Sequence, residues 1–253
     1  MSVIKELIEF YNSFSGDKGV FGKSYFGKDL YYFKVVKTAY PKVICQYSIH
    51  AREYITTYLA LEQIKIFERV GRVGTVYFLP MLNPDGVNIC LNENPLHKAN
   101  GRGVDLNVNF PARWGKGEKN VKKSGSENYI GAYPLSEPES KSLANFTLDI
   151  SPHATISYHS KGEEIYYEFN QPKPQLDRDR ALALLLAKST GYAIKSTPNS
   201  TGGYKDWCIE KLKIPAFTIE VGSDKLSHPI RKQSLTKIKK QNEKVVQILT
   251  ENL

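Results

Sequence analysis

Chemically versatile side chains stand at or just after the ends of three apolar runs in the sequence. They are His50 and Glu53 of His50-Ala51-Arg52-Glu53 after residues 43–49, His159 after residues 154–158, and Glu220 within residues 216–221. Two imidazoles and one carboxylate make a His₂Glu set, which leaves the fourth position of a zinc ion open for water or substrate. The three-residue spacing of His50 and Glu53 lets both side chains of a tight turn point the same way. This pattern favours a catalytic zinc site.

Each of these residues also has an ordinary explanation. A lone HxxE motif arises often by chance and is typical of a surface turn, and a lone histidine after a strand is typical of a core position. The zinc-site interpretation is favoured because two of only five histidines directly follow apolar runs. Glu220 is the more informative residue, since a buried carboxylate is costly unless it is neutralised, paired or close to a metal.

Strand and helix patterns alternate along the whole chain and would position these residues. Strands are predicted at residues 43–49, 75–82, 154–158 and 216–221. Helices are predicted at residues 3–11, 54–69, 136–148, 180–190 and 235–249. Such alternation implies a sheet covered on both faces. Ligands bind such open sheets outside the carboxyl ends of the strands, where the candidate residues lie.

Length, composition and charge exclude several classes of protein. The 253 residues are 41% hydrophobic and 24% charged, which is ordinary globular usage. No stretch approaches the ~18 unbroken apolar residues of a membrane span. The N-terminal residues mix charge into their apolar positions, so we expect no signal peptide. The formal charge of +9 suits an anionic partner or simply a well-solvated surface. No DNA-binding motif or basic aromatic stripe supports a nucleic-acid partner.

The three cysteines, Cys45, Cys90 and Cys208, form neither a disulfide framework nor a CxxC metal motif. Cys45 and Cys90 lie in apolar runs and are predicted to be buried. A reducing compartment, the cytoplasm, fits this cysteine usage best. No repeat or linker divides the chain, so we expect residues 1–253 to form one domain.

Six segments resemble, in order and spacing, the zinc carboxypeptidase family that includes the pancreatic carboxypeptidases. They are SIHARE, LNPDG, GVDLN, ISYHS, GGYKDW and FTIEVG. The resemblance covers nearly the whole chain. It implies an α/β fold, a single-domain three-layer α/β/α architecture with a mixed, twisted sheet of about eight strands. It also implies one Zn²⁺ per chain, held by His50, Glu53 and His159, and metal-assisted hydrolysis with Glu220 as the general base.

The resemblance also assigns residues around the metal ligands. Asp105 in GVDLN matches the carboxylate that orients a ligand histidine, although a turn residue beside a glycine is a plainer explanation. The family commonly places an arginine shortly before GVDLN to stabilise the oxyanion, and this sequence has Lys98 there, with Arg102 nearby. Lysine supplies a point charge but not a bidentate fork. A solvated lysine is the alternative.

Substrate contacts are implied at Arg102 and at three further positions. Arg52 and Asn107 match substrate-binding positions of the family, or else are solvated polar residues. The tyrosine that closes over substrate in the digestive enzymes is replaced near Pro198. Tyr204 lies close by and is expected either to take that role or to pack in the core.

Val108 is the most informative departure from the family. True carboxypeptidases carry Asn-Arg where this chain has Asn107-Val108, and that arginine grips the terminal carboxylate of the substrate. A hydrogen bond to a charged group is worth ~1.5–3 kcal/mol, and valine cannot make it. An ordinary C-terminal carboxypeptidase is therefore disfavoured, unless another cation substitutes.

Several stretches of the sequence are similar to one branch of the family, the bacterial γ-D-glutamyl-diamino acid peptidases. The segments are ENYIGAYPLSEPES, ISYHSKGEEIYYEF and TGGYKDW with IPAFTIEVG. Members of this branch cleave between D-Glu and meso-diaminopimelate or lysine in peptidoglycan stem peptides, which implies stem peptides or muropeptides as partners. The alternatives are a conventional metallocarboxypeptidase and a non-catalytic wall-binding protein of the same fold. The sequence does not indicate an oligomeric state or a membrane partner.

Overall fold

Eight strands form one mixed sheet in the computed structural model, which describes residues 2–124 and 127–253. In spatial order β1-β2-β4-β3-β5-β8-β6-β7 they are Asp17–Lys23, Asp29–Val36, Thr75–Leu79, Lys42–Tyr47, Ala154–His159, Ala216–Glu220, Glu164–Tyr166 and Ala193–Ile194. The four central strands β4, β3, β5 and β8 run parallel. The edges add antiparallel pairs, β1 with β2, β2 with β4, and β6 with β8. The predicted α/β class with a mixed sheet is confirmed.

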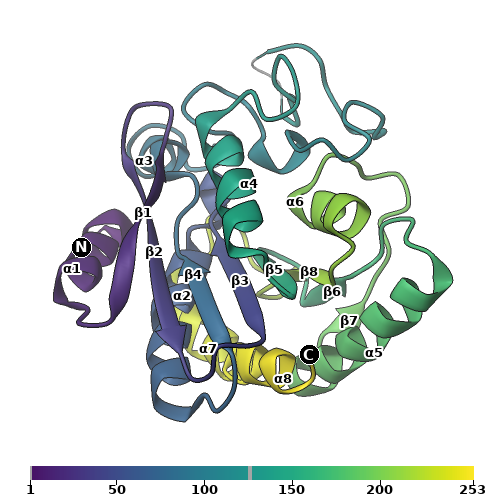
Figure 1. Ribbon diagram of the computed structural model, residues 1–253. Coiled ribbons are helices and arrows are strands. Elements are labelled where there is room, and N and C mark those ends of the chain that lie inside the picture. Colours follow the sequence, from purple (N-terminus) through teal and green to yellow (C-terminus); the bar gives the residue numbers. More distant parts are fainter. Residues whose placement is uncertain (1, 125–126) are drawn as a thin grey trace.

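Helices cover both faces of this sheet (Figure 1). One face packs against α1 (Val3–Ser13), α2 (Ile55–Val70), α5 (Lys173–Thr190), α7 (Leu235–Asn242) and α8 (Val245–Glu251). The other packs against α4 (Pro138–Ile150) and α6 (Tyr204–Trp207). The short helix α3 (Pro84–Asn92) and the turns η1 (Ala51–Glu53), η2 (Leu106–Val108), η3 (Cys208–Leu212) and η4 (Lys232–Ser234) complete the chain. This is the three-layer α/β/α arrangement that the resemblance implied.

Strand β3 shows why the central strands are apolar on both sides. Successive side chains of a strand point to opposite faces. Val43 and Cys45 accordingly join the core beneath α2 and α8, whereas Ile44 between them joins the core beneath α4 and α6. A strand that is buried on both faces carries no polar alternation, which explains its continuous apolar pattern.

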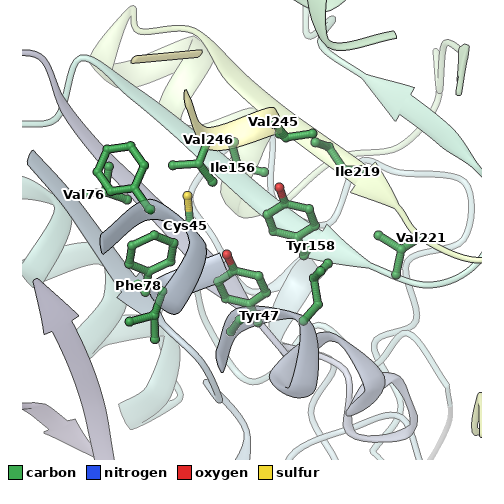
Figure 2. Close-up of a cluster of buried hydrophobic side chains, with 14 of the residues drawn as sticks. Cys45, Tyr47, Val76, Phe78, Ile156, Tyr158, Ile219, Val221, Val245 and Val246 are labelled. Carbon is green, nitrogen blue, oxygen red and sulfur yellow. The ribbon is translucent and has the colours of Figure 1, made fainter. Parts of the chain in front are cut away.

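A stacked tyrosine pair closes the core just behind the ends of β3 and β5. Tyr47 and Tyr158 are register partners, their ring centroids are 4.8 Å apart and their planes differ by 3°. Figure 2 shows the two hydroxyls within this apolar cluster. Gln63 of α2 satisfies both, since its Oε1 accepts from Tyr47 at 2.6 Å and its Nε2 donates to Tyr158 at 2.8 Å. Buried hydroxyls need such partners, and the arrangement ties the two strands to α2.

One expectation about the elements is wrong, because the closing helix expected at residues 235–249 is two helices, α7 and α8. The N-terminal hairpin of β1 and β2 was not predicted. Helix α7 packs mainly on α2, and α8 packs on α5, so the chain bends between them to reach two partners. The three cysteines are buried and free, as predicted for Cys45 and Cys90. Within the described ranges, no helix combines the length and hydrophobicity needed to cross a bilayer.

Candidate metal centre and cleft

The candidate residues meet at the carboxyl ends of three neighbouring parallel strands. His50 lies three residues beyond the end of β3, His159 ends β5, and Glu220 ends β8. His159 and Glu220 are direct register partners across the β5–β8 pair. Chain order reverses here, because β4 follows β3 on one side and β5 lies on the other. The residues therefore stand at a topological switch point, where open α/β sheets bind ligands.

A hydrogen-bonded turn brings His50 and Glu53 to the same side. The Ser48 N–H donates to Thr56 Oγ1 at 2.9 Å, and the Thr57 hydroxyl donates to the carbonyl of Pro80 at 2.7 Å. The following turn η1 places Glu53 three residues after His50, with the Ala51 N–H bound to the Lys98 carbonyl at 2.9 Å. The loop that carries Lys98 is thereby docked onto the turn.

His50, Glu53 and His159 form a buried cluster of converging donor atoms. One ligand atom from each lies within 4.8 Å of the others. His50 Nδ1 is 2.9 Å from Glu53 Oε1, His159 Nδ1 is 3.1 Å from Glu53 Oε2, and the two Nδ1 atoms are 3.3 Å apart. Ligands held about 2.1 Å from one tetrahedral zinc lie roughly 3.4 Å apart. These residues therefore fit a zinc ion.

The charges of the cluster also suit a cation. Burial lowers the pKa of His50, but Glu53 and Asp105 outweigh it and raise that pKa to about 9. Burial alone would raise the pKa of Glu53, and the two imidazoles hold it well below its usual range. The same carboxylates that favour an imidazolium here would favour a divalent cation in its place.

Asp105 fixes the orientation of His50. Its Oδ1 lies 3.1 Å from His50 Nε2 and accepts from the Asn107 N–H at 2.9 Å, while its Oδ2 pairs with Lys98 Nζ at 2.6 Å. A proton on Nε2, shared with the carboxylate, leaves Nδ1 free as a metal ligand. Burial raises the pKa of Asp105, but Lys98 and His50 reverse this and keep the group ionised.

Glu220 faces the same cleft as His50. The residue is half-buried, and its Oε2 atom is shielded from solvent without a hydrogen-bond partner among the described residues. Burial and the nearby charge of Glu53 raise its pKa well above the usual carboxyl range. A shielded carboxylate of raised pKa in a cleft is suited to accept and release a proton.

A cleft of about 520 Å³ opens in front of these residues. Its wall contains Lys98, Asn107 and Val108, as well as segments 117–120 and 197–201 from two loops. Lys98 also donates to Asn128 Oδ1 at 2.7 Å, a partner not foreseen from the sequence. Pro198 also lines the cleft.

The structure does not bring three of the expected substrate residues into this cleft. Tyr204 is 0% exposed, packs against Phe110 and donates or accepts a 2.7 Å hydrogen bond with Thr147, so its expected substrate contact is corrected to core packing. The Arg102 guanidinium points to Glu137, 3.6 Å away. Arg52 binds Glu127 at 2.9 Å. The guanidinium groups of Arg52 and Arg102 are paired with these carboxylates, and neither residue belongs to the described lining of the cleft.

Two further cations, Arg113 and Lys161, are also occupied elsewhere. Arg113 lies 3.4 Å from Glu210, and Lys161 donates to the Asp224 carbonyl at 2.7 Å. Neither belongs to the described lining of the cleft. Sequence reasoning also missed Lys205, which lines a recess of the cleft. The segment GGYKDW contains it, but nothing in the spacing separates it from its neighbour Tyr204.

The sequence matches the zinc carboxypeptidase family over residues 15–245. Over 219 residues it is 31% identical to γ-D-glutamyl-L-diamino acid endopeptidase 1 of Lysinibacillus sphaericus, which covers 72% of this chain and 55% of that protein. The chain spans about half the length of several curated relatives that it matches.

Solved structures of other proteins share the fold. Bovine thrombin-activatable fibrinolysis inhibitor, in complex with tick carboxypeptidase inhibitor, superposes with a TM-score of 0.87 at 23% identity, over 99% of this chain and 96% of that chain. Murein-tripeptide amidase MpaA of Escherichia coli O157 superposes with a TM-score of 0.69 at 20% identity, over 94% and 95%.

Proposed function

The chain belongs to the zinc carboxypeptidase family, and from that premise we propose that it hydrolyses the γ-D-Glu to diamino acid bond of peptidoglycan stem peptides. The diamino acid is meso-diaminopimelate or lysine. The proposal treats residues 1–253 as one catalytic domain acting on stem peptides or muropeptides. The named activities of the Lysinibacillus endopeptidase and of murein-tripeptide amidase MpaA support this substrate class.

Val108 is the observation that carries the choice within the family. It lines the cleft beside Asn107, where a terminal carboxylate would need a cation. An aliphatic side chain offers no donor to that carboxylate. A substrate that is recognised through groups other than that terminal carboxylate suits the cleft better.

His50, Glu53 and His159 would hold the metal through Nδ1, a carboxylate oxygen and Nδ1. When bound, zinc supplies a Lewis acid that polarises a carbonyl and acidifies water. Asp105 keeps the His50 ring in the orientation that this requires.

Glu220 is proposed as the general base and then the general acid. Its carboxylate takes a proton from the attacking water and delivers it to the leaving nitrogen of the diamino acid. The raised pKa of Glu220 favours holding that proton between the two steps. Lys98, on the same wall, places a positive charge near the oxyanion as it develops.

Two other functions remain as rivals. A conventional metallocarboxypeptidase is disfavoured by Val108. A non-catalytic wall-binding protein would share the fold and the basic charge of +9, but would not need Glu220 beside a complete set of metal ligands. The free state of the three cysteines supports a reducing compartment, the cytoplasm, for the proposed activity.

Mass spectrometry of products from defined peptides tests the proposal. The zinc-loaded protein is incubated with L-Ala-γ-D-Glu-meso-diaminopimelate, with the lysine analogue and with a hippuryl dipeptide, each with and without a chelator. We expect release of the free diamino acid, abolished by the chelator. Hydrolysis of the hippuryl peptide alone would favour the conventional carboxypeptidase. A lack of both stoichiometric zinc and turnover would favour the wall-binding protein.

A further inference from the structure

The segment 116–123 at the mouth of the cleft carries an uneven charge. It contains four lysines against one glutamate, a net charge of +3 out of the +9 of the whole chain. The four lysines are all exposed and together form the lysine rim, which consists of Lys116, Lys119, Lys122 and Lys123. Lys119 belongs to the lining of the cleft, as do its neighbours Glu118 and Asn120. The charge therefore lies where a substrate enters.

No partner within the described part of the chain accounts for this charge. None of the four ammonium groups of the lysine rim forms an ion pair or a hydrogen bond with a residue that the structure describes. By contrast, Lys98, Lys161 and Lys237 all pair with carboxylates. The one acid of the segment, Glu118, is bound to the opposite wall, because its Oε1 accepts from Asn199 Nδ2 at 2.5 Å. Like charges gathered in so short a segment repel one another, and an anion from outside would relieve that repulsion.

Hydrogen bonds hold the segment in place at the mouth of the cleft. Asn120 Oδ1 accepts from the Thr201 hydroxyl at 3.1 Å, which ties the segment to one wall. The Val121 N–H donates to the Asn128 carbonyl at 3.0 Å, and Asn128 Oδ1 accepts from Lys98 at 2.7 Å, which ties it to the other. A segment fixed on both sides keeps its charges beside the path of the substrate, unlike a freely solvated basic tail.

The remaining charges of the cleft largely offset one another. Lys98 pairs with Asp105 at 2.6 Å. The positive charge of a bound zinc ion would face the carboxylates of Glu53 and Glu220. The wall at residues 197–201 carries no charged side chain. The lysine rim is therefore the main source of net charge around the described walls of the cleft, and it favours an anionic ligand.

Stem peptides are suitable anions, and their charge depends on the N-terminus. At pH 7, L-Ala-γ-D-Glu-meso-diaminopimelate carries three carboxylates and two ammonium groups, whereas its lysine analogue carries two of each. In a muropeptide the alanine nitrogen is part of an amide, so one ammonium group is lost, and N-acetylation imitates this capping. The net charge is thus about zero for the lysine tripeptide, about −1 for the diaminopimelate tripeptide and about −2 for its N-acetyl form.

From this complementarity we infer that the lysine rim is a docking surface for the anionic stem, and that it favours capped stems, as in muropeptides, over free peptides. The inference rests on the proposed function and adds to it the form in which the substrate arrives. Attraction by the rim raises the concentration of the anion at the cleft and its rate of entry. The rim therefore acts on KM and leaves kcat unchanged.

The test compares kcat and KM of the zinc-loaded wild type and a rim variant on these three peptides. The rim variant is Lys116→Gln/Lys119→Gln/Lys122→Gln/Lys123→Gln. At about 10 mM ionic strength it should lose about tenfold in kcat/KM on the N-acetyl peptide, less on the free diaminopimelate peptide and almost nothing on the lysine peptide. At about 500 mM ionic strength the loss should disappear, because exposed charges are then screened.

A matched control removes the same charge from four exposed lysines outside the described lining of the cleft. It is Lys5→Gln/Lys188→Gln/Lys240→Gln/Lys244→Gln. This variant should lose about twofold at most on any of the three peptides, because its charges lie farther from the cleft.

Several results would overturn the inference while leaving stem-peptide hydrolysis intact. They are an equal loss on all three peptides, a loss that persists at high ionic strength, and the absence of any loss. Calorimetry with long-chain polyphosphate tests the other kind of anion. Tight binding of polyphosphate through the lysine rim, with no effect of the rim on the peptides, would assign the surface to a polymer and overturn the inference as well.

A binding measurement separates this inference from the proposed reaction. Calorimetry with Glu220→Gln should show that the N-acetyl peptide binds about tenfold more weakly at about 500 mM than at about 10 mM ionic strength. The rim substitutions in the same background should remove most of that difference. This outcome without any turnover by the wild type would support the docking surface and contradict the proposed reaction. Binding that responds neither to salt nor to the rim substitutions would contradict the docking surface whatever the turnover.

Discussion

Glu220 lies in an environment that is unusual for a carboxylate. It ends an apolar strand, and its shielded Oε2 has no hydrogen-bond partner among the described residues. Such a group is unfavourable for stability unless it is protonated or near a cation. A site that keeps it there is suited to proton transfer, because burial and the nearby charge of Glu53 raise the pKa of this carboxyl and so favour its taking up a proton.

Glu220→Gln is the direct test of that role. Glutamine keeps the shape of the side chain but cannot accept the proton, so kcat should fall by about 10² to 10⁴-fold. Zinc content, measured by elemental analysis, should stay near one per chain because no metal ligand changes. Glu118→Gln, which removes a carboxylate from the same cleft, should keep activity within a few-fold. Substantial turnover by the Glu220 variant would contradict the assignment.

Val108→Arg tests the reason for disfavouring an ordinary carboxypeptidase. A guanidinium at this wall position would supply the missing bidentate donor for a terminal carboxylate. We expect kcat/KM on hippuryl peptides to rise about tenfold or more, measured by release of hippurate. Val108→Met adds length without charge and should give no such gain. If both variants behave alike, another group already binds that carboxylate.

The metal ligands could be predicted from the sequence, whereas three of the four expected substrate contacts are absent from the described lining of the cleft. His50, His159 and Glu220 stand at the ends of apolar runs, and the topology of parallel strands brings such ends together. Tyr204 and Lys205 are adjacent on α6, yet the first packs in the core and the second lines the recess. One step along a helix turns a side chain by about 100°, and the sequence alone did not reveal the orientation of α6.

At the scale of elements, the N-terminal hairpin of β1 and β2 could not be predicted, because its sequence reflects contacts with distant parts of the chain. Strand β1 contains Gly19 and Gly22 and has no fully buried residue, so its sequence lacks the usual β-branched pattern. A Cβ on Gly22 would lie 2.2 Å from Ser142 Oγ of α4. The glycine therefore reflects the close approach of a helix from a distant part of the chain. Central strands, whose apolar pattern reflects burial on both faces, could be predicted.

The start of α4 carries a pH-sensitive contact that ties it to the loop before η2. The Glu139 carboxylate accepts from the Tyr25 N–H at 3.0 Å and from Asn100 Nδ2 at 3.2 Å. Burial, aided by the charge of Glu137, outweighs these hydrogen bonds and raises the pKa of Glu139 to about 7. Asn100 also accepts from the Val104 N–H, so the contact reaches the loop that ends at Asp105.

A carboxyl group whose pKa is raised in the folded protein makes the fold less stable as the pH rises. The contribution of Glu139 is fully present below the unfolded pKa and is lost as pH rises towards about 7. We expect the free energy of unfolding to fall by roughly 2 to 4 kcal/mol between pH 4.5 and pH 8 through this group. Urea denaturation of wild type and Glu139→Gln across that range isolates it, since the difference between the two should change with pH. Glu9→Gln, on the exposed face of α1, should show no such change.

At the scale of the whole molecule, the contacts behind the metal ligands indicate that the sheet does not need the metal to keep its fold. The stacked pair of Tyr47 and Tyr158 joins β3 to β5 directly behind the ligands, and Gln63 fixes both to α2. Glu53 also has a partner outside the cluster, the Ser160 N–H that donates to it at 3.2 Å, and His50 pairs with Asp105. We therefore expect the chelated protein to keep its fold, unlike small zinc domains that depend on their ion.

Zinc should nevertheless raise the stability of the whole chain, because it binds the folded cluster far better than the unfolded chain. At a free concentration 1,000 times its Kd, a ligand adds about 4 kcal/mol, which corresponds to a rise in Tm of roughly 10 °C for a chain of this size. Calorimetry of the chelated and reloaded protein measures this rise. His159→Gln should lose most of it, because one of three buried ligands is gone. His153→Gln should keep it, since His153 lies before β5 and its Nδ1 accepts from the Lys42 N–H at 3.1 Å. An equal Tm with and without zinc in the wild type would mean that the cluster does not hold the ion, and the proposed hydrolysis would lose its premise.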